Sequence, residues 1–164
     1  MMTTSSHTAV VTLPTDTQIL ITREFAAPRH LVYRASTTPE LIKRWWSGER
    51  GEMTLAEVDL RVGGRWRYVM TANAGFEVAF HGEYLEIVPD ERIVHTEVYE
   101  GIPDADEAAA TVTVTFEEKD GHTLLSTLVQ HKNQQNRDMH IDSGMEGGMQ
   151  EAFDKLEQVA VSLL

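Results

Sequence analysis

The chain of 164 residues carries 14 Lys and Arg against 26 Asp and Glu, a formal net charge of −12. A chain of this length buries roughly 70% of the surface that it exposes when unfolded, which predicts one self-sufficient domain. The sequence contains no Cys, and this excludes disulfides, thiol catalysis and cysteine-built metal sites. The surplus of acid disfavours contact with a phosphate backbone, so we expect no nucleic-acid partner.

The sequence shows neither a membrane-spanning nor a secretory pattern. Its apolar runs are shorter than the roughly 20 residues that a membrane-spanning helix needs. Residues 1–12 are rich in Ser and Thr and lack the basic and apolar regions of a secretory signal. We therefore expect a cytoplasmic protein with a flexible N-terminal tail over residues 1–16 and a single domain over residues 17–164.

A strand and two short helices are expected first. Residues 18–25 alternate between two faces, which predicts a strand. Pro28 then suits the first turn of a helix, and apolar residues recur at helical spacing to about Ser36. A second helical pattern starts at Thr38, a candidate N-cap, and Pro39, and it runs on to Trp45 and Trp46.

Six further strands in hairpins are expected next. Their ranges are 57–62, 65–70, 76–88, 92–99, 110–117 and 123–131. Gly63-Gly64 and Asp120-Gly121 are residue pairs typical of tight hairpin turns. The polar residues 49–54 are expected to form a loop, as is the acidic segment 100–109.

The last element has the strongest helical pattern. Apolar residues follow helical spacing over residues 145–163, and Ser143 with Glu146 matches a capping box. The polar segment 133–142 before it can hold a short helix of its own. Because a sheet and a helix with one apolar face each must bury those faces together, we expect an α+β fold. In it, a curved antiparallel sheet wraps around the long C-terminal helix. A sandwich with appended helices is the alternative, and it is less favoured because only one helix can cover a sheet.

Several motifs resemble a known family. They are Thr38-Pro39-Glu40-Leu41 with Trp45-Trp46, Asp59-x-Arg61-x-Gly63-Gly64-x-Trp66, and Gly82-Glu83-Tyr84-Leu85-Glu86-Ile87-x-Pro89. Over residues 18–164 the chain resembles the START-like (SRPBCC) superfamily, and within it the branch named after activators of the heat-shock chaperone ATPase. The resemblance implies a helix-grip fold with a cavity between sheet and C-terminal helix, which in this superfamily binds apolar or aromatic small molecules. It carries over no catalytic residues.

We expect the ligand to contact residues that project from both sides of this cavity. They are Trp46, Trp66, Tyr68, Phe80, Tyr84, Met145, Met149 and Phe153. The competing interpretation is an ordinary core, in which buried aromatic and Met side chains fill space. Gly82, between two of the aromatic residues, either opens room for a ligand or another backbone, or marks a bulge that curves the sheet.

The polar candidates support weaker hypotheses. The seven His residues show no metal-binding spacing, and no nucleotide-binding motif occurs, so we expect neither a metal nor a cofactor. His95 and Glu97 share a strand face as a possible dyad, although a wet edge of the sheet is the favoured interpretation, and His131 is a candidate acid or base. A cyclase- or hydrolase-type enzyme is therefore the alternative function. A chaperone-interaction module, suggested by the acidic loop, is the third, and a homodimer is the default assembly.

Overall fold

Residues 8–164, which the computed structural model describes, contain one eight-stranded antiparallel sheet. Its strands are β1 (Val10–Thr12), β2 (Gln18–Phe25), β3 (Gly51–Val58), β4 (Arg65–Ala72), β5 (Glu77–Val88), β6 (Arg92–Tyr99), β7 (Ala110–Lys119) and β8 (His122–Gln130). The order across the sheet is β1-β2-β8-β7-β6-β5-β4-β3. Strand β2 therefore pairs with the last strand, while β3 to β8 form a continuous meander.

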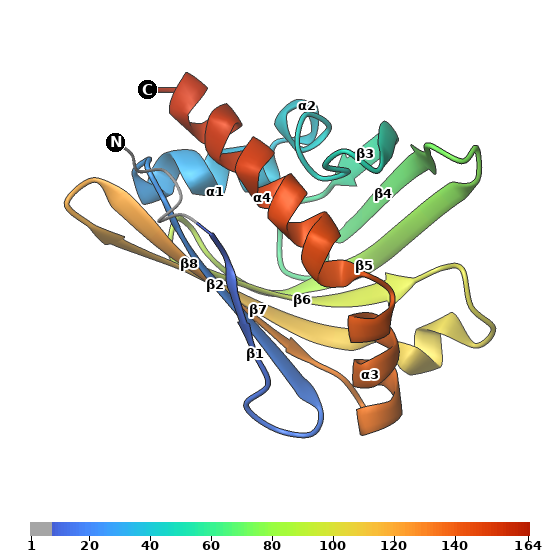
Figure 1. Ribbon diagram of the computed structural model, residues 1–164. Coiled ribbons are helices and arrows are strands. Elements are labelled where there is room, and N and C mark those ends of the chain that lie inside the picture. Colours follow the sequence, from blue (N-terminus) through green and yellow to red (C-terminus); the bar gives the residue numbers. More distant parts are fainter. Residues whose placement is uncertain (1–7) are drawn as a thin grey trace.

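The helices complete the α+β helix-grip fold that the sequence predicts. They are α1 (Arg29–Thr37), α2 (Pro39–Ile42), the 3-10 helix η2 (Ala105–Ala108), α3 (Gln134–Asp142) and α4 (Met145–Ser162). Helices α1 and α4 lie over the same face of the curved sheet, and the long α4 crosses that face diagonally (Figure 1). Within residues 8–164, no helix is both long and apolar enough to cross a membrane.

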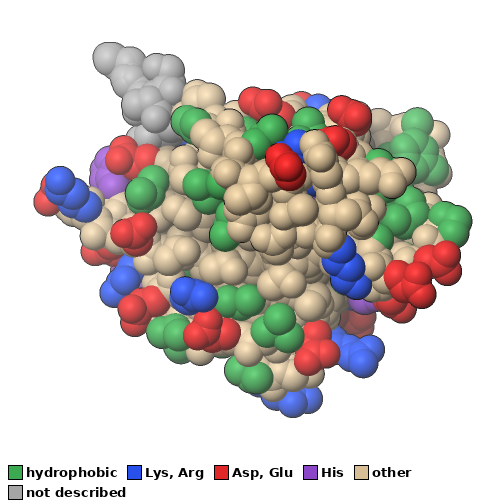
Figure 2. Space-filling model, turned by 90° about the horizontal axis from the view of Figure 1, so that it is seen from below, with side chains coloured by type: hydrophobic (Ala, Val, Ile, Leu, Met, Phe, Trp, Pro, Cys, Tyr) green, Lys and Arg blue, Asp and Glu red, His purple; other side chains and the backbone are tan. Residues whose placement is uncertain are grey.

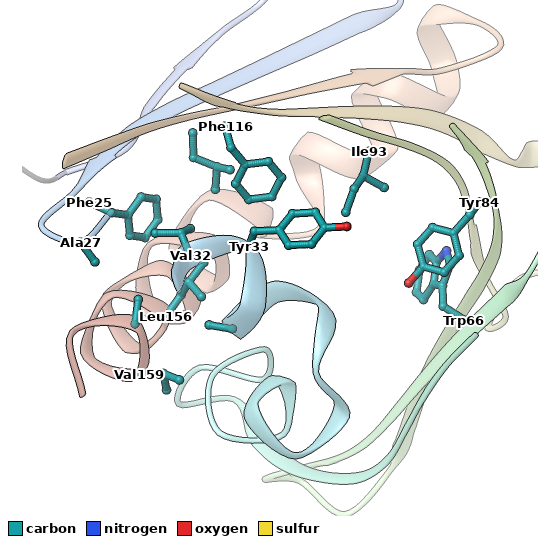
Figure 3. Close-up of a cluster of buried hydrophobic side chains, with 13 residues drawn as sticks. Phe25, Ala27, Val32, Tyr33, Trp66, Tyr84, Ile93, Phe116, Leu156 and Val159 are labelled. Atoms are coloured by element: carbon teal, nitrogen blue, oxygen red, sulfur yellow. The ribbon is translucent and has the colours of Figure 1, made fainter. Parts of the chain in front are cut away.

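The main core lies where α1 and α4 meet the sheet. Phe25, Phe116 and Leu156 come from β2, β7 and α4, and each is at most 1% exposed. Figure 3 shows Tyr33 reaching from α1 toward the part of the sheet that carries Tyr84. Burial of these large side chains is the dominant favourable contribution to folding, at roughly 25 cal/mol per Å² of apolar surface.

A buried arginine fastens α4 to the sheet. Arg23 on β2 is only 4% exposed, and its guanidinium donates to the carbonyl oxygen of Phe153. It also contacts Asp154 at 3.1 Å and Glu157 at 3.3 Å. Because an unpaired buried charge is costly, these contacts on α4 explain why β2 tolerates a charge on the same face as its apolar residues.

Strand β3 lies earlier in the chain than the alternating pattern predicts. The expected strand over residues 57–62 is wrong from residue 59 onward, and the expected loop 49–54 contains the start of β3. Asp59–Gly64 instead form a loop closed by hydrogen bonds from Arg61 N to Asp59 O and from Gly64 N to Arg61 O. Leu60 and Val62 alternate correctly but are 39% and 62% exposed, so no buried face selects that register.

Part of the expected tail is also structured. Val10–Thr12 form strand β1, and Val10 pairs with Thr22 and Thr12 with Leu20 on β2. Residues 1–7 lie outside the described residues. The backbone pairing explains the strand, since β2 would otherwise leave an open edge.

The predicted capping box at the start of α4 is wrong. Gly144 is the N-cap, with φ of +83° and no side-chain cap. Ser143 instead donates from its hydroxyl to the carbonyl oxygen of His140 at 2.6 Å, so it completes the end of α3. Thr38 likewise makes no side-chain cap for α2, whereas Asn133 caps α3 by accepting a hydrogen bond from Asn136 N at 2.8 Å.

Most charged side chains, Arg23 and Arg137 excepted, lie outside this layered interior. Figure 2, a view from below, shows acidic and basic side chains scattered around the face, with uncharged polar side chains and backbone prominent at its centre. The net charge of −12 is therefore mostly carried by the outer surface.

Candidate functional site

A group of aromatic side chains lines the inner face of β4, β5 and β6. Cross-strand register brings them together, because Trp66 pairs with Gly82 and Tyr68 with Phe80, while Tyr84 pairs with His95. Residues that face each other across an antiparallel pair lie on the same side of the sheet. The sequence-predicted residues on β4 and β5 therefore share one surface.

Ring contacts connect this surface to the segment after α2. Trp46 packs edge-on against both Tyr68 and Phe80, with ring centroids 5.4 and 5.3 Å apart. Trp66 lies 4.7 Å from Tyr68, and Phe80 lies 5.2 Å from Tyr99. These separations are those of favourable aromatic pairs.

Exposure increases along the row of rings. Trp66 and Tyr84 are buried at 3% and 4% exposure, so they belong to the core. Tyr68 and Phe80 are only partly buried, and Tyr99 is 42% exposed. The row thus runs from the core to solvent, and its middle members keep surface that a ligand can contact.

Gly82 is explained by close packing inside the sheet. A methyl group at this position would overlap the carbonyl oxygen of Thr96 and the indole nitrogen of Trp66. Trp66 Nε1 donates to that same carbonyl oxygen at 3.2 Å. The missing side chain therefore makes room for the indole and the backbone, and the irregularity in register lies further along, between Tyr84 and Glu86.

The segment that carries Trp46 is held against α4. Glu151 on α4 accepts from Arg50 Nε at 3.1 Å and from the backbone N–H of Glu49 at 3.2 Å. Lys155, one turn further along α4, contacts Glu49 at 3.3 Å. These contacts position Trp46 opposite the aromatic residues of β4 and β5.

Two polar side chains stand among the aromatic residues. His95 and Glu97 lie on the same face of β6 as Ile93, and both are half-buried. Strand β6 lies between β5 and β7 inside the sheet, so this strand face is not at an edge of the sheet. Burial lowers the pKa of His95, and its Nδ1 contacts the backbone oxygen of Thr96 at 2.9 Å. Burial also raises the pKa of Glu97 from 4.5 to about 7. Both groups are therefore able to be neutral near pH 7.

Tyr68 connects these polar groups to the aromatic row. Burial raises its pKa well above the usual value, and the neighbouring Tyr84 and Glu97 raise it further. Its hydroxyl therefore stays protonated and can donate a hydrogen bond. Tyr68, His95 and Glu97 together provide a neutral donor, an imidazole and a carboxyl group on one apolar surface, an arrangement that can orient a small molecule.

The sequence-predicted residues on α4 lie in a different cluster. Met145 and Met149 pack against a cluster that contains Ile19 and Val129 on β2 and β8. Phe153 contacts both this cluster and the main core, with its ring 5.6 Å from Phe25. Trp46 packs against a third cluster, formed by Ile42, Met53 and Ala56. The eight candidates therefore divide among three clusters, and Phe153 connects two of them.

A second group of polar side chains lies beside α3. His131 Nε2 and His140 Nδ1 are 3.0 Å apart, and burial is the main cause that lowers the pKa of both, to about 4 for His140. Among residues 8–164, no three His, Asp or Glu side chains lie close enough together to hold a metal ion. His131 is thus a partner of His140, away from the aromatic row.

A surface depression of about 600 Å³ lies near η2 on the opposite face of β5. His81 and Glu100 line it, with Asp104 and Asp106 from the following loop. Arg67 holds Glu100 through two contacts of 2.9 Å, and His81 contacts the same carboxylate at 2.7 Å. The paired charges make this depression a structural connection between loop and sheet rather than an apolar pocket.

Comparison with known families identifies a family that this chain matches. The sequence profile described as "Activator of Hsp90 ATPase homolog 1-like protein" matches residues 26–160. A search of curated proteins found no match.

Solved structures share the fold. A protein from Rhodobacter sphaeroides is 25% identical, with a TM-score of 0.86 and coverage of 96% of this chain and 99% of the other. A protein from Mycobacterium smegmatis is 24% identical, with a TM-score of 0.82 and coverage of 92% and 96%. One from Chromobacterium violaceum is 27% identical, with a TM-score of 0.73 and coverage of 89% and 98%. These similarities concern the fold and do not identify a ligand.

Proposed function

The chain belongs to the Activator of Hsp90 ATPase homolog 1-like family, a branch of the START-like superfamily, and from this membership we propose that it binds a small apolar or aromatic molecule. The binding surface is the aromatic row on the inner face of β4 and β5, with Trp46 opposite. The observation that carries the proposal is the partial exposure of Tyr68 and Phe80 on a face that otherwise forms the core.

Partial exposure distinguishes these rings from core aromatics. Phe25 and Phe116 are 0% and 1% exposed, as expected of side chains that only fill space. Tyr68 and Phe80 pack against the core and against Trp46 but remain partly exposed to solvent. Apolar surface with a few polar groups beside it is the usual composition of a small-molecule site.

A matched pair of phenylalanine variants tests this proposal. The neutral fluorescent probe N-phenyl-1-naphthylamine should bind the wild-type protein and gain fluorescence. Phe80→Ala should weaken binding at least tenfold, because it removes a ring that faces the ligand. Phe76→Ala should leave binding unchanged, since Phe76 is 59% exposed just before β5.

Two results would contradict the proposal. One is equal binding by both variants and the wild-type protein. The other is the absence of binding by any apolar probe, which would favour the chaperone-interaction hypothesis. Thermal unfolding of each variant separates lost binding from lost folding.

An enzyme of cyclase or hydrolase type is the second candidate. It is favoured by Glu97, whose pKa of about 7 suits an acid or base at neutral pH, and by His95 on the same face. If the protein turns over an apolar ester or a cyclisable polyketide analogue, Glu97→Gln should reduce kcat while Phe80→Ala mainly raises KM. Unchanged kcat in Glu97→Gln would exclude Glu97 as the acid or base.

A further inference from the structure

Glu97 stands in the proposed site without a compensating charge. Within residues 8–164 its carboxylate has no hydrogen-bond or ion-pair partner, and burial is the one resolved cause of its raised pKa. The nearest charge-bearing candidate on the same strand face is His95, whose lowered pKa leaves it neutral near pH 7. A carboxylate in such a position lacks the pairing that buried charges ordinarily have.

The Glu97 carboxylate is also able to contact a ligand. Among the described side chains, the polar atom that is both fully buried and unpartnered is Nδ1 of His131. Because the Glu97 oxygens are unpartnered as well, they must retain accessible surface. Glu97 is thus deep enough to be desolvated and open enough to be reached.

The surrounding aromatic rings favour a positively charged ligand, as the Glu97 carboxylate does. Tyr68 lies close enough for Glu97 to affect its pKa, and its ring packs against Trp66 and Trp46. Faces of aromatic rings carry negative charge density and bind cations, as do carboxylates. The net charge of −12 adds a long-range preference for a positive over a negative ligand.

We propose that the ligand of this site is an organic cation, an ammonium group attached to an apolar or aromatic body. The ammonium donates to Glu97 and lies against the ring of Tyr68, and the apolar body lies along Phe80. This inference rests on the proposed function, because it specifies the chemical class of the molecule that occupies the same surface.

Three probes of one shape separate the charge preference from apolar binding. They are 1-naphthylmethylamine, which is cationic, 1-naphthylmethanol, which is neutral, and 1-naphthoate, which is anionic. At pH 8, where Glu97 is ionised and the amine is protonated, the wild-type protein should bind the amine at least tenfold more tightly than the alcohol. It should bind the naphthoate most weakly. Charge-assisted hydrogen bonds and cation–π contacts are together strong enough for this difference.

Glu97→Gln should remove the preference for the amine over the alcohol. The matched control is Glu83→Gln, which removes an exposed carboxylate on β5 and should keep the preference. A preference that persists in Glu97→Gln overturns the inference, because its source then lies elsewhere. Equal binding of amine and alcohol by the wild-type protein overturns the inference but leaves the proposed function intact. Failure of all three probes to bind overturns both.

Dependence on pH provides a test that needs no change in Glu97. Between pH 8 and pH 6 the wild-type preference for the amine should fall at least threefold as Glu97 gains a proton. Two other titratable groups lie near Glu97: His95 on the same strand, and Tyr68 on β4, whose pKa Glu97 affects. Tyr68 stays protonated because its pKa is raised. The same fall in Glu97→Gln would assign the effect to His95 and overturn the inference.

Discussion

The indole nitrogen of Trp66 on β4 donates a hydrogen bond of 3.2 Å to the carbonyl oxygen of Thr96 on β6. Strand β5 lies between these two strands, and the contact is possible because Gly82 on β5 has no side chain. This relationship fixes the indole against the sheet and makes it a wall of the aromatic row rather than a mobile side chain.

Gly82→Ala should therefore destabilise the protein by about 2–3 kcal/mol, because the added methyl overlaps both Trp66 and the backbone of Thr96. Thermal or urea unfolding measures the loss. Gly148→Ala is the control: Gly148 lies inside α4 with open space around it, so alanine should stabilise the helix by about 0.5–1 kcal/mol. Equal effects of the two substitutions would mean that Gly82 is not closely packed.

Glu97→Gln should change how stability depends on pH. The folded-state pKa of about 7 lies above the ordinary value of 4.5, so the folded protein holds the proton more tightly. This contribution lowers wild-type stability as pH rises from about 4.5 to about 7. The variant lacks this contribution and should gain about 3 kcal/mol relative to wild type between pH 4 and pH 8. A difference that is constant over this range would show that Glu97 is not desolvated.

His140→Gln should have the opposite dependence. Burial and the neighbouring His131 lower the pKa of His140 from 6.5 to about 4, so the unfolded chain gains a proton first. Wild-type stability should therefore fall as pH drops from about 6.5 to about 4. His140→Gln should lose about 2–3 kcal/mol less than wild type over this range. A profile for His140→Gln that is identical to the wild-type profile would contradict the assignment.

Arg23→Lys should loosen the connection between β2 and α4. The planar guanidinium of Arg23 donates to Asp154, Glu157 and the Phe153 carbonyl oxygen, and the compact ammonium of lysine cannot reach all three. The variant therefore leaves a buried charge incompletely paired. We expect a loss of about 2 kcal/mol in urea unfolding. Arg34→Lys, at an exposed position on α1, should change stability by less than about 0.5 kcal/mol. Faster hydrogen exchange confined to α4 in Arg23→Lys would locate the effect, and unchanged stability would exclude the anchoring role.

Two strands with a buried face, β2 and β6, were predictable to the residue. The predicted ranges 18–25 and 92–99 coincide with β2 and β6, because alternation there reflects real burial of residues such as Ile19 and Ile93. Strand β3 was placed wrongly, since Leu60 and Val62 continue the alternation into an exposed loop. Two registers suited the pattern locally, and pairing with β4 selected the one that ends at Val58.

The candidate site was likewise predictable from the sequence only in part. Its aromatic composition was evident from the sequence, and alternation along β6 correctly put His95 and Glu97 on one face. Alternation could not show how deeply each side chain is buried. A wet edge was therefore the favoured interpretation for Glu97, whereas burial raises its pKa to about 7. Nor did spacing show that Trp66 is sealed in the core while Tyr68 keeps exposed surface.

The sequence by itself determined the class of fold, the family resemblance and the exclusion of thiol chemistry, because periodicity, motifs and composition are properties of short segments. The tertiary structure alone decided which aromatic rings remain accessible and which carboxylate is desolvated among them. Burial at those positions depends on residues far apart in the chain, such as Trp46, Phe80 and Glu97, and only the curvature of the sheet beneath α4 brings these together.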